Sequence, residues 1–186
     1  MIIGIVGSIA SGKDTVAEYL EKQGFKNISH SDTLRQMMRD EGIETTIPNM
    51  TEYGNNLRNA KGYGYLAKVI SDQISEGEDA VVTSIRQVGE IEYYRENRPD
   101  FHLLKLDAPK EIRLERLIKR NRAGDIRSMA ELEVIEAKQA DGKGGAMNMN
   151  RCYELADSEI INDGSFEDLY AKVDNLVEEL KNDRQN

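Results

Sequence analysis

A glycine-rich stretch close to the N-terminus carries the residue types that bind phosphate. In GSIASGKDT, residues 7–15, the glycines Gly7 and Gly12 stand five positions apart and Lys13 follows directly. In the pattern G-x-x-x-x-G-K-[ST], backbone N–H groups and the start of the next helix surround a polyphosphate, and the lysine reaches its β- and γ-phosphates. The residues expected to surround the nucleotide phosphates here are Gly7, Ala10, Ser11, Gly12, Lys13, Asp14 and Thr15. The alternative is a plain glycine-rich turn.

Asp14 stands where the pattern has a serine or threonine, whose hydroxyl holds the magnesium of a bound nucleotide. A carboxylate is also a good magnesium ligand, and the first turn of a helix favours an anion. We therefore expect Asp14 to bind Mg²⁺ directly or through water, with the ion offsetting repulsion between the carboxylate and the phosphates. Many phosphate-binding loops are also supported by an acid at the end of a later strand, but the expected strand 80–84 ends in Thr83 and Ser84.

Apolar runs alternate with helical patterns along the chain, which predicts an α/β fold with a parallel sheet between two helical layers. The expected strands are Ile2–Val6, Phe25–Ile28, Ala80–Ser84, Phe101–Leu106 and Glu159–Ile161. The expected helices are Lys13–Lys22, Asp32–Glu41, Thr51–Ile74, Val88–Arg95, Lys110–Asn121, Met129–Ala140 and Phe166–Lys181. The phosphate-binding stretch therefore lies between a strand and an amphipathic helix, as the phosphate-binding function requires.

The 186 residues suit a single domain, and two stretches exceed a minimal sheet-and-helix sandwich. Residues 41–64 are rich in asparagine and glycine, and we expect them to form a mobile segment that binds an acceptor. Residues of about 113–150 are expected to form a helical lid, because glycine-rich joints frame a helix there. Two surface loops are the alternative.

Two arginines follow successive expected strands: Arg35 in HSDTLRQMM and Arg86 in TSIRQ. The carboxyl ends of parallel strands share one edge of a sheet, which is where ligands bind in such folds. We expect both guanidinium groups to hold a second phosphate there, with surface salt bridges as the alternative. Arg58, close to Tyr53, Tyr63 and Tyr65 in the acceptor segment, is a further candidate for substrate contact.

A third group of arginines lies on the expected helix 110–121. Leu114, Leu117 and Ile118 form its packing stripe, and the arginines follow a neighbouring face. The members of this group are Arg113, Arg116 and Arg120, with Arg122 just beyond the helix. Arginines on a lid would neutralise charge on a phosphoryl group in transfer, whereas an exposed basic face is the structural alternative.

Asp32 has two interpretations. It follows the second expected strand and could face an acceptor phosphate or magnesium there. It also precedes a helix in SDTLRQ, so Asp32 or Ser31 could simply cap that helix. A phosphate acceptor needs no strong general base, so the role of Asp32 stays open.

Composition narrows the class of ligand. The formal charge is −9, from 25 basic and 34 acidic residues, with no basic stripe, which argues against sequence-independent binding of nucleic acid. A single cysteine, Cys152, and the lack of a long apolar run favour a cytoplasmic protein with no membrane partner. The guanine-reading motif N-K-x-D is missing, which disfavours a switch GTPase. Oligomeric state has no signal in the sequence.

These motifs together resemble the P-loop nucleoside and nucleotide monophosphate kinases, and the resemblance extends over nearly the whole chain. HSDTLRQMMRDEG is similar to the adenylate kinase segment that holds the acceptor's phosphate, and ERLIKRNRAGD is similar to the lid arginine motif. IINDGSFEDL resembles the last strand and turn of dephospho-CoA kinases, which implies that backbone near Asn162 and Gly164 lies by the adenine. The GKD and SIRQ segments also resemble phage-type deoxynucleoside monophosphate kinases.

The resemblance implies a three-layer P-loop NTPase fold that transfers a phosphoryl group from Mg·ATP to a small phosphorylated acceptor, first of all a nucleoside or deoxynucleoside monophosphate. It implies phosphate contacts for Arg35 and Arg86, and catalytic roles for Lys13, Arg116, Arg120 and Arg122. A dephospho-CoA kinase is the alternative enzyme, because its hydroxyl acceptor would need a base such as Asp32. A nucleotide-binding regulatory protein without phosphotransfer is the alternative of another class.

Overall fold

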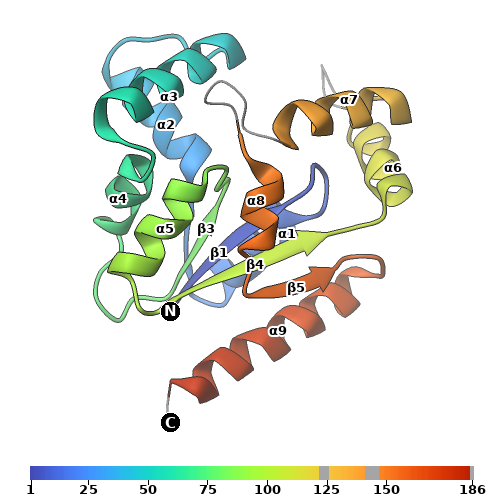
Figure 1. Ribbon diagram of the computed structural model, residues 1–186. Helices are drawn as coiled ribbons and strands as arrows, with labels where there is room; N and C mark the ends of the chain where they lie inside the picture. Colours follow the sequence, from blue (N-terminus) through green and yellow to red (C-terminus); the bar gives the residue numbers. More distant parts are fainter. Residues whose placement is uncertain (122–125, 141–146, 185–186) are drawn as a thin grey trace.

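The computed structural model describes residues 1–121, 126–140 and 147–184. Within these ranges the strands form one parallel sheet in the order β2-β3-β1-β4-β5, so the expected five-stranded sheet is confirmed (Figure 1). The strands are β1 (Ile2–Gly7), β2 (Lys26–Ser29), β3 (Ala80–Thr83), β4 (Phe101–Asp107) and β5 (Ser158–Ile161). Because β1 is central, the loop that follows it emerges at the middle of the carboxyl edge of the sheet.

The helices connect these strands and cover both faces of the sheet. They are α1 (Lys13–Lys22), α2 (His30–Asp40), α3 (Ile47–Lys61), α4 (Tyr65–Ser71), α5 (Val88–Asn97), α6 (Lys110–Arg120), α7 (Met129–Ala140), α8 (Met149–Glu154) and α9 (Phe166–Asp183). In the part of the chain that the structure describes, none of these helices is long and apolar enough to cross a membrane.

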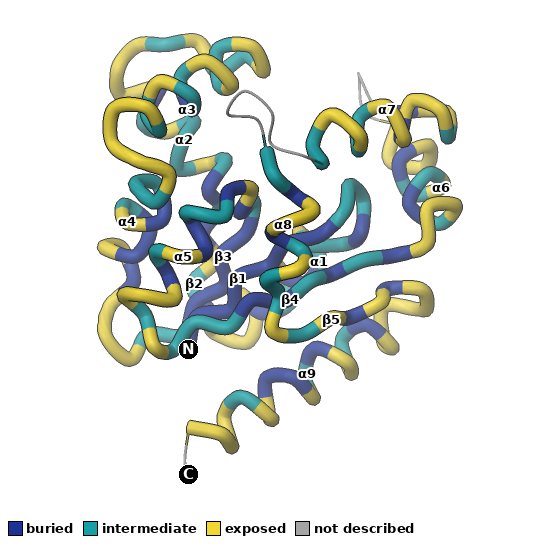
Figure 2. The backbone as a smooth tube through the Cα atoms, in the orientation of Figure 1, coloured by how far each residue is buried: buried dark blue, intermediate teal, exposed yellow. Residues whose placement is uncertain are grey.

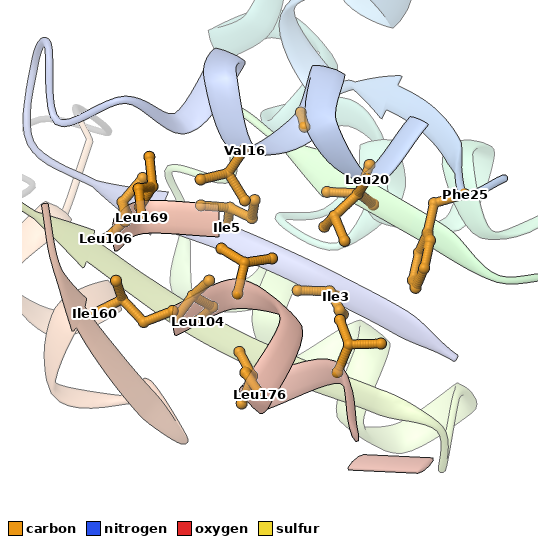
Figure 3. Packing of buried hydrophobic residues seen from close by; sticks show 14 of the residues in the cluster. Ile3, Ile5, Val16, Leu20, Phe25, Leu104, Leu106, Ile160, Leu169 and Leu176 are labelled. Carbon is orange, nitrogen blue, oxygen red and sulfur yellow. The ribbon is translucent and has the colours of Figure 1, made fainter. Parts of the chain in front are cut away.

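Strand β1 separates two hydrophobic cores, because successive side chains of a strand point to opposite faces. Ile3 and Ile5 pack with residues of α1 and α9, including Leu20 and Leu176 (Figure 3). On the other face, Ile2 and Val6 belong to a core shared with α4, α5 and α8. Every residue of β1 is buried, so the phosphate-binding loop begins from a fully enclosed strand (Figure 2).

The carboxyl edge of the sheet carries two helical arms. In the view of Figure 1, α2 and α3 lie at the upper left, and α6 and α7 lie at the upper right. The second arm has a small core of its own, in which Leu117, Ile126 and Leu132 pack together. Ile9 and Ala10 of the phosphate-binding loop pack against this core, so the loop contacts the α6–α7 arm directly.

Three local expectations were wrong. The single helix expected over 51–74 is two helices, α3 and α4, because the chain turns at Gly62 with φ +95°, a conformation that favours glycine. The short helix α8 had no signal strong enough to be expected. Ile118, expected in the packing stripe of its helix, is 51% exposed, whereas Leu117 is buried.

Candidate phosphate-binding site

The loop between β1 and α1 has the tight backbone that a phosphate-binding loop requires. Gly12 has φ +106°, and a Cβ there would lie 2.5 Å from Asn162 Nδ2. A Cβ on Gly7 would collide with the carbonyl oxygen of Leu106 in the neighbouring strand. Ala10 also adopts a left-handed conformation, with φ +60°, which L-residues seldom adopt. The two glycines of the motif are therefore required by close packing against β4 and against the chain after β5.

Lys13 folds back over the loop. Its Nζ donates to the carbonyl oxygens of Gly7, at 2.8 Å, and Ser8, at 2.7 Å. An ammonium group has three donors, so among the described hydrogen bonds one donor remains for a phosphate oxygen. The pKa of Lys13 is lowered to about 8, chiefly by burial; Asp14 and Asp107 oppose the shift, and Arg86 and Arg113 add to it.

Arg116 and Asn162 fasten the loop from two distant parts of the chain. Arg116 Nη1 donates to the carbonyl oxygens of Ala10 and Ser11 at 3.3 and 3.4 Å. Its Nη2 donates to the backbone oxygen and to Oδ1 of Asn162 at 3.0 and 3.1 Å. Asn162 Nδ2 in turn donates to Ser11 O at 2.8 Å. Loop residues 7–15 together with Arg116 and Asn162 are called the P-loop side below.

The turn after β5 is held by its own hydrogen bonds. Asn162 N donates to Asp107 O at 2.7 Å, which continues the pairing of β5 with β4. Ser165 and Asp168 form a reciprocal capping box at the start of α9. A Cβ on Gly164 would lie 2.7 Å from Asp168 Oδ2, so this position favours glycine. The turn predicted to lie by adenine is thus rigidly attached to the P-loop.

Arg113 does not belong to an exposed basic face. It is 3% exposed, and its Nε donates to Ala108 O at 2.8 Å. Its Nη1 forms an ion pair with Glu136 of α7 and also reaches Ile9 O at 3.3 Å. A buried guanidinium of this kind is paired because an isolated buried charge is costly. Arg113 therefore ties the P-loop to both helices of the arm, which the one-face pattern along α6 did not predict.

Arg120 and Arg122 complete the expected arginine group. Arg120 ends α6, and like Arg113 and Arg116 it occupies the helix that contacts the loop. Arg122 lies outside the described residues. Their expected contacts with a phosphoryl group stay predictions.

Arg35, Arg58 and Arg86 occupy the other arm and the turn after β3, and are called the arginine side below. Arg35 Nη1 donates to Asp32 Oδ1 at 2.6 Å, and Arg58 Nη2 donates to Asn55 Oδ1 at 2.6 Å. Arg86 Nη1 is 3.5 Å from Met147 Sδ, and a thioether is a weak acceptor. Desolvation lowers the pKa of Arg86 although its side chain reaches solvent; Glu90 opposes this shift and Arg35 adds to it. Arg35 and Arg86 follow β2 and β3, which are adjacent in the sheet.

Neither capping residue expected for α2 caps it. Ser29, the last residue of β2, is the N-cap, and its Oγ accepts from Asp32 N at 3.4 Å. The helix begins at His30, two residues earlier than expected, because β2 itself ends in a residue with a capping hydroxyl. The Asp32 side chain is exposed and pairs with Arg35, so it takes no part in capping.

Two carboxylates lie near Lys13, and the sequence interpretation found one of them. Asp14 is exposed in the first turn of α1, as expected. Asp107 ends β4, and its charge also acts on Lys13. The expected strand stopped at Leu106, one residue too early. The rule that placed Arg35 and Arg86 at strand ends would have found Asp107 as well.

A cavity of about 450 Å³ adjoins the P-loop on its α7–α8 side. Ser8, Asp107, Arg113, Glu136 and Tyr153 are among its lining residues. Neither Lys13 nor the arginine side lines it, so the cavity is a neighbour of the expected phosphate path and not the path itself.

Comparison with known proteins places this geometry in a family. The family model described as an AAA domain matches residues 3–138. A UPF0200 protein of Methanothrix thermoacetophila is 30% identical over 179 residues, covering 96% of this chain and 97% of that protein. The chain belongs to the UPF0200 family. A UPF0200/UPF0201 protein of Archaeoglobus fulgidus is also 30% identical over 96% of this chain, but the chain spans only 55% of that relative's length.

Solved structures share the fold of this UPF0200 chain. Dephospho-CoA kinase from Campylobacter jejuni matches with a TM-score of 0.61 and 18% identity, over 98% of each chain. Shikimate kinase from Bacteroides thetaiotaomicron matches with a TM-score of 0.60 and 13% identity, over 97% of this chain and 98% of that chain. At these identities the likeness concerns the fold, which is the three-layer fold of P-loop kinases.

Proposed function

We propose that this protein transfers the γ-phosphoryl group of Mg·ATP to a small phosphorylated acceptor, a nucleoside or deoxynucleoside monophosphate. The single observation that carries the proposal is a row of three cations along the carboxyl edge of the sheet. Arg35, Arg86 and Lys13 follow β2, β3 and β1, which are adjacent strands of the sheet. Burial is the largest cause of the lowered pKa of Lys13 and of Arg86. Asp14 and Glu90 oppose these two shifts, whereas Arg86 adds to the first and Arg35 adds to the second. Mutually repelling cations at one edge favour a polyanion laid along them.

The row has a direction that suits two phosphorylated substrates. Lys13 lies on the P-loop, where the donor's β- and γ-phosphates are expected. Arg86, in the turn after β3, and Arg35, on α2, lie farther along the edge, where the phosphate of the acceptor would sit. Arg86 is central in this order, so the acceptor phosphate that it holds would lie next to the terminal phosphate of the donor, as transfer between them requires.

Asp32 bears on the choice between a phosphate acceptor and a hydroxyl acceptor. A dephospho-CoA kinase needs a group that receives the proton of its ribose hydroxyl, and Asp32 was the candidate. In this structure Asp32 Oδ1 accepts from Arg35 at 2.6 Å in an exposed ion pair, which leaves the dephospho-CoA alternative to the acceptor screen. A monophosphate acceptor needs no such base, since its phosphate oxygen is already a nucleophile.

Magnesium fits the residues near Lys13 only with the nucleotide's help. Among the described residues no group of three or more acidic, histidine or cysteine side chains could hold a metal. Mg²⁺ is commonly bound by one or two carboxylates together with phosphate oxygens and water. Asp14 would supply one carboxylate, and Asp107 is available as a second. Magnesium would neutralise phosphate charge during transfer.

The residues of the chain then have distinct tasks. The loop amides and Lys13 hold the donor phosphates, and the turn at Asn162–Gly164 lies beside its base. Arg86 and Arg35 hold the acceptor phosphate, and Arg58 contributes from α3. Arg120 and Arg122, on the helical lid, would neutralise charge on the phosphoryl group in transfer and exclude water.

A screen of acceptors tests the proposal. ADP release from Mg·ATP is measured with each common ribo- and deoxyribonucleoside monophosphate, and with dephospho-CoA, at matched concentrations. The expected result is stimulation by one or a few monophosphates. Stimulation by dephospho-CoA alone would show that the acceptor is dephospho-CoA and not a nucleoside monophosphate. ATP binding without any acceptor-stimulated release of ADP would indicate a nucleotide-binding regulator instead.

A further inference from the structure

Beneath the arginine side lies a buried polar group that the phosphate chemistry leaves unused. Glu90 of α5 is 4% exposed, and His30 of α2 is 2% exposed. Their closest approach is 3.4 Å, between Glu90 Oε1 and His30 Nδ1. His30 Nε2 lies 3.0 Å from the hydroxyl of Tyr94. Buried ionisable groups are costly to desolvate, so their contacts need an explanation.

The other oxygen of Glu90 holds the backbone of Arg86. Glu90 Oε2 accepts from Arg86 N at 2.9 Å and from Gln87 N at 3.1 Å. Burial alone would raise the pKa of Glu90, but His30 and these two amides together lower it, so the carboxylate is charged. A charged acceptor makes hydrogen bonds about twice as strong as a neutral one. The turn that carries Arg86 is therefore fixed to this one side chain.

The same carboxylate touches the first turn of the helix that carries Arg35. His30 is the first residue of α2, and Arg35 follows within the same helix. A second contact joins the two strand ends nearby, since Ser29 Oγ donates to Ser84 Oγ at 3.3 Å. Ser84 has φ +61°, which marks a constrained turn between β3 and Arg86.

A comparison within the chain separates this arrangement from ordinary helix capping. Asp168 occupies the equivalent capping position of α9, where it accepts from the amide of its own N-cap. Asp168 is exposed and bonds only within its own turn among the described hydrogen bonds. Glu90 caps α5 in the same way but is buried, and it reaches a second helix. Capping alone does not require burial or the contact with His30.

We propose that Glu90 is a positioning residue of the acceptor-phosphate site, bridging the Arg86 turn to His30 and so setting the spacing between Arg86 and Arg35. This inference rests on the proposed function, because it assigns a purpose to the spacing of those two arginines. Loss of the bridge should lower the affinity for the acceptor's phosphate. The affinity for the donor nucleotide should not change, because none of the described hydrogen bonds of Glu90 reaches the P-loop.

Glu90→Ala is the main variant, and Glu90→Gln keeps an oxygen that can accept from the two amides. Glu92→Ala is the matched control, because Glu92 is an exposed glutamate of the same helix. With the acceptor found by the screen, Glu90→Ala should raise the acceptor KM about tenfold and leave the ATP KM within about twofold. Glu90→Gln should recover most of the loss, and Glu92→Ala should match the unchanged protein.

A measurement of phosphate binding tests the inference independently of catalysis. Inorganic phosphate is titrated calorimetrically into protein saturated with ADP, and ADP affinity is measured separately. Glu90→Ala should bind phosphate about tenfold more weakly with unchanged ADP affinity. If no acceptor is turned over, the proposed function fails while this titration still tests the bridge.

His30→Ala removes the other end of the bridge and carries the test if Glu90→Ala does not fold. It should show the same selective loss of phosphate affinity, checked beside a thermal melting curve. Unchanged phosphate affinity in a folded Glu90→Ala or His30→Ala variant overturns the inference. Equal losses of phosphate and ADP affinity overturn it too, because they indicate general destabilisation.

Discussion

The P-loop side and the arginine side are built in opposite ways. On the P-loop side, Arg116 and Asn162 bond to Ser11 across sequence separations of 105 and 151 residues. On the arginine side, Arg35 and Arg58 bond to partners three residues away on their own helices. The donor half of the proposed site is preorganised by tertiary contacts, whereas the acceptor half presents arginine side chains on weak or local contacts that an anion can replace.

This difference has a physical reason. A polyphosphate held by backbone amides needs a fixed loop, and the loop's shape must come from parts of the chain that meet only in the fold. Exposed i,i+3 ion pairs contribute little to stability, so exchanging one for a phosphate costs little. Substitutions on the P-loop side should therefore change donor binding and folding together, and those on the arginine side should change acceptor binding alone.

The largest expected effect is that of Lys13→Met. Loss of the ammonium group should lower kcat/KM by about 10²–10³, as for removal of a single donor to transition-state charge. ADP release with the acceptor from the screen measures it. Lys22→Met, an exposed lysine at the other end of α1, is the control and should leave kcat/KM unchanged. Full activity of the Lys13→Met variant would contradict the phosphate-binding role that we assign to the loop.

Arg86→Ala tests whether the arginine side binds the acceptor and not the donor. The acceptor KM should rise about 10- to 100-fold, the size expected for losing hydrogen bonds between charged groups, while the melting temperature stays within a few degrees. Steady-state kinetics with each substrate varied in turn separates the two KM values. Arg39→Ala on α2 is the control, since Arg39 is exposed and bonds to Gln36 of its own helix. A larger rise in the ATP KM would contradict the assignment.

Asp14→Ala tests the unusual position in the loop. Magnesium-dependent turnover should fall about 10- to 100-fold, the range typical of groups that support a bound metal. Metal-free binding of ADP, measured by calorimetry in the presence of a chelator, should change little. Asp107→Asn compares the second carboxylate in the same assay. Equal losses of turnover and of metal-free binding for Asp14→Ala would exclude a role in holding magnesium.

Asn162→Ala tests whether the contacts that hold the P-loop support both folding and donor binding. It removes the side-chain amide that donates to Ser11 O and accepts from Arg116 Nη2, and the loss of these two hydrogen bonds should cost about 1–3 kcal/mol of folding stability. We expect a lower melting temperature together with a raised ATP KM and an unchanged acceptor KM. Asn182→Ala is the control, because it removes the same side chain near the far end of α9, and it should leave both KM values unchanged. A raised acceptor KM alone would reverse the assignment of the two sides.

The smallest expected effect is a pH dependence. The pKa of Lys13 is lowered to about 8, so its ammonium group loses its proton as the pH rises through 8, and ADP affinity should fall by up to about tenfold per pH unit above it. The unfolded chain keeps this proton to about pH 10, so the charged group destabilises the fold below pH 8 and this cost declines at higher pH. Calorimetric titration between pH 7 and about 9.5 measures the slope, which Lys13→Met should lack.

Much of the fold and half of the site were predictable from local pattern. The five strands, the loop at Gly7–Lys13 and the approach of Arg35 and Arg86 to one edge followed from apolar runs and from where each run ends. The boundary errors at Ser29 and Asp107 each involved one or two residues at the end of an element, whereas at Gly62 a helix expected to be continuous is divided in two. Such ends depend on capping and pairing contacts that a single run of sequence does not specify.

Side-chain partners over long distances were beyond prediction. Arg113 and Arg116 lie one turn apart on α6 and are equivalent in pattern, yet one is buried against Glu136 and the other is bonded to the P-loop. Glu90 and His30 are charged or polar residues in otherwise ordinary helical stretches, and only the way the helices pack on the sheet brings them into contact. Periodicity assigns a residue to a face of a helix; it does not say what that face meets.

The sequence alone therefore determined that this chain has a P-loop in which an aspartate replaces the usual serine or threonine. It also determined that this loop lies on a parallel α/β sheet, with arginines at the same edge. The tertiary structure decided which groups hold that loop, which carboxylates stand beside Lys13, and that Glu90 connects the Arg86 turn to His30 of α2. The first set depends on contacts between near neighbours in sequence, whose geometry the backbone imposes. The second depends on which faces meet when the helical arms pack on the sheet.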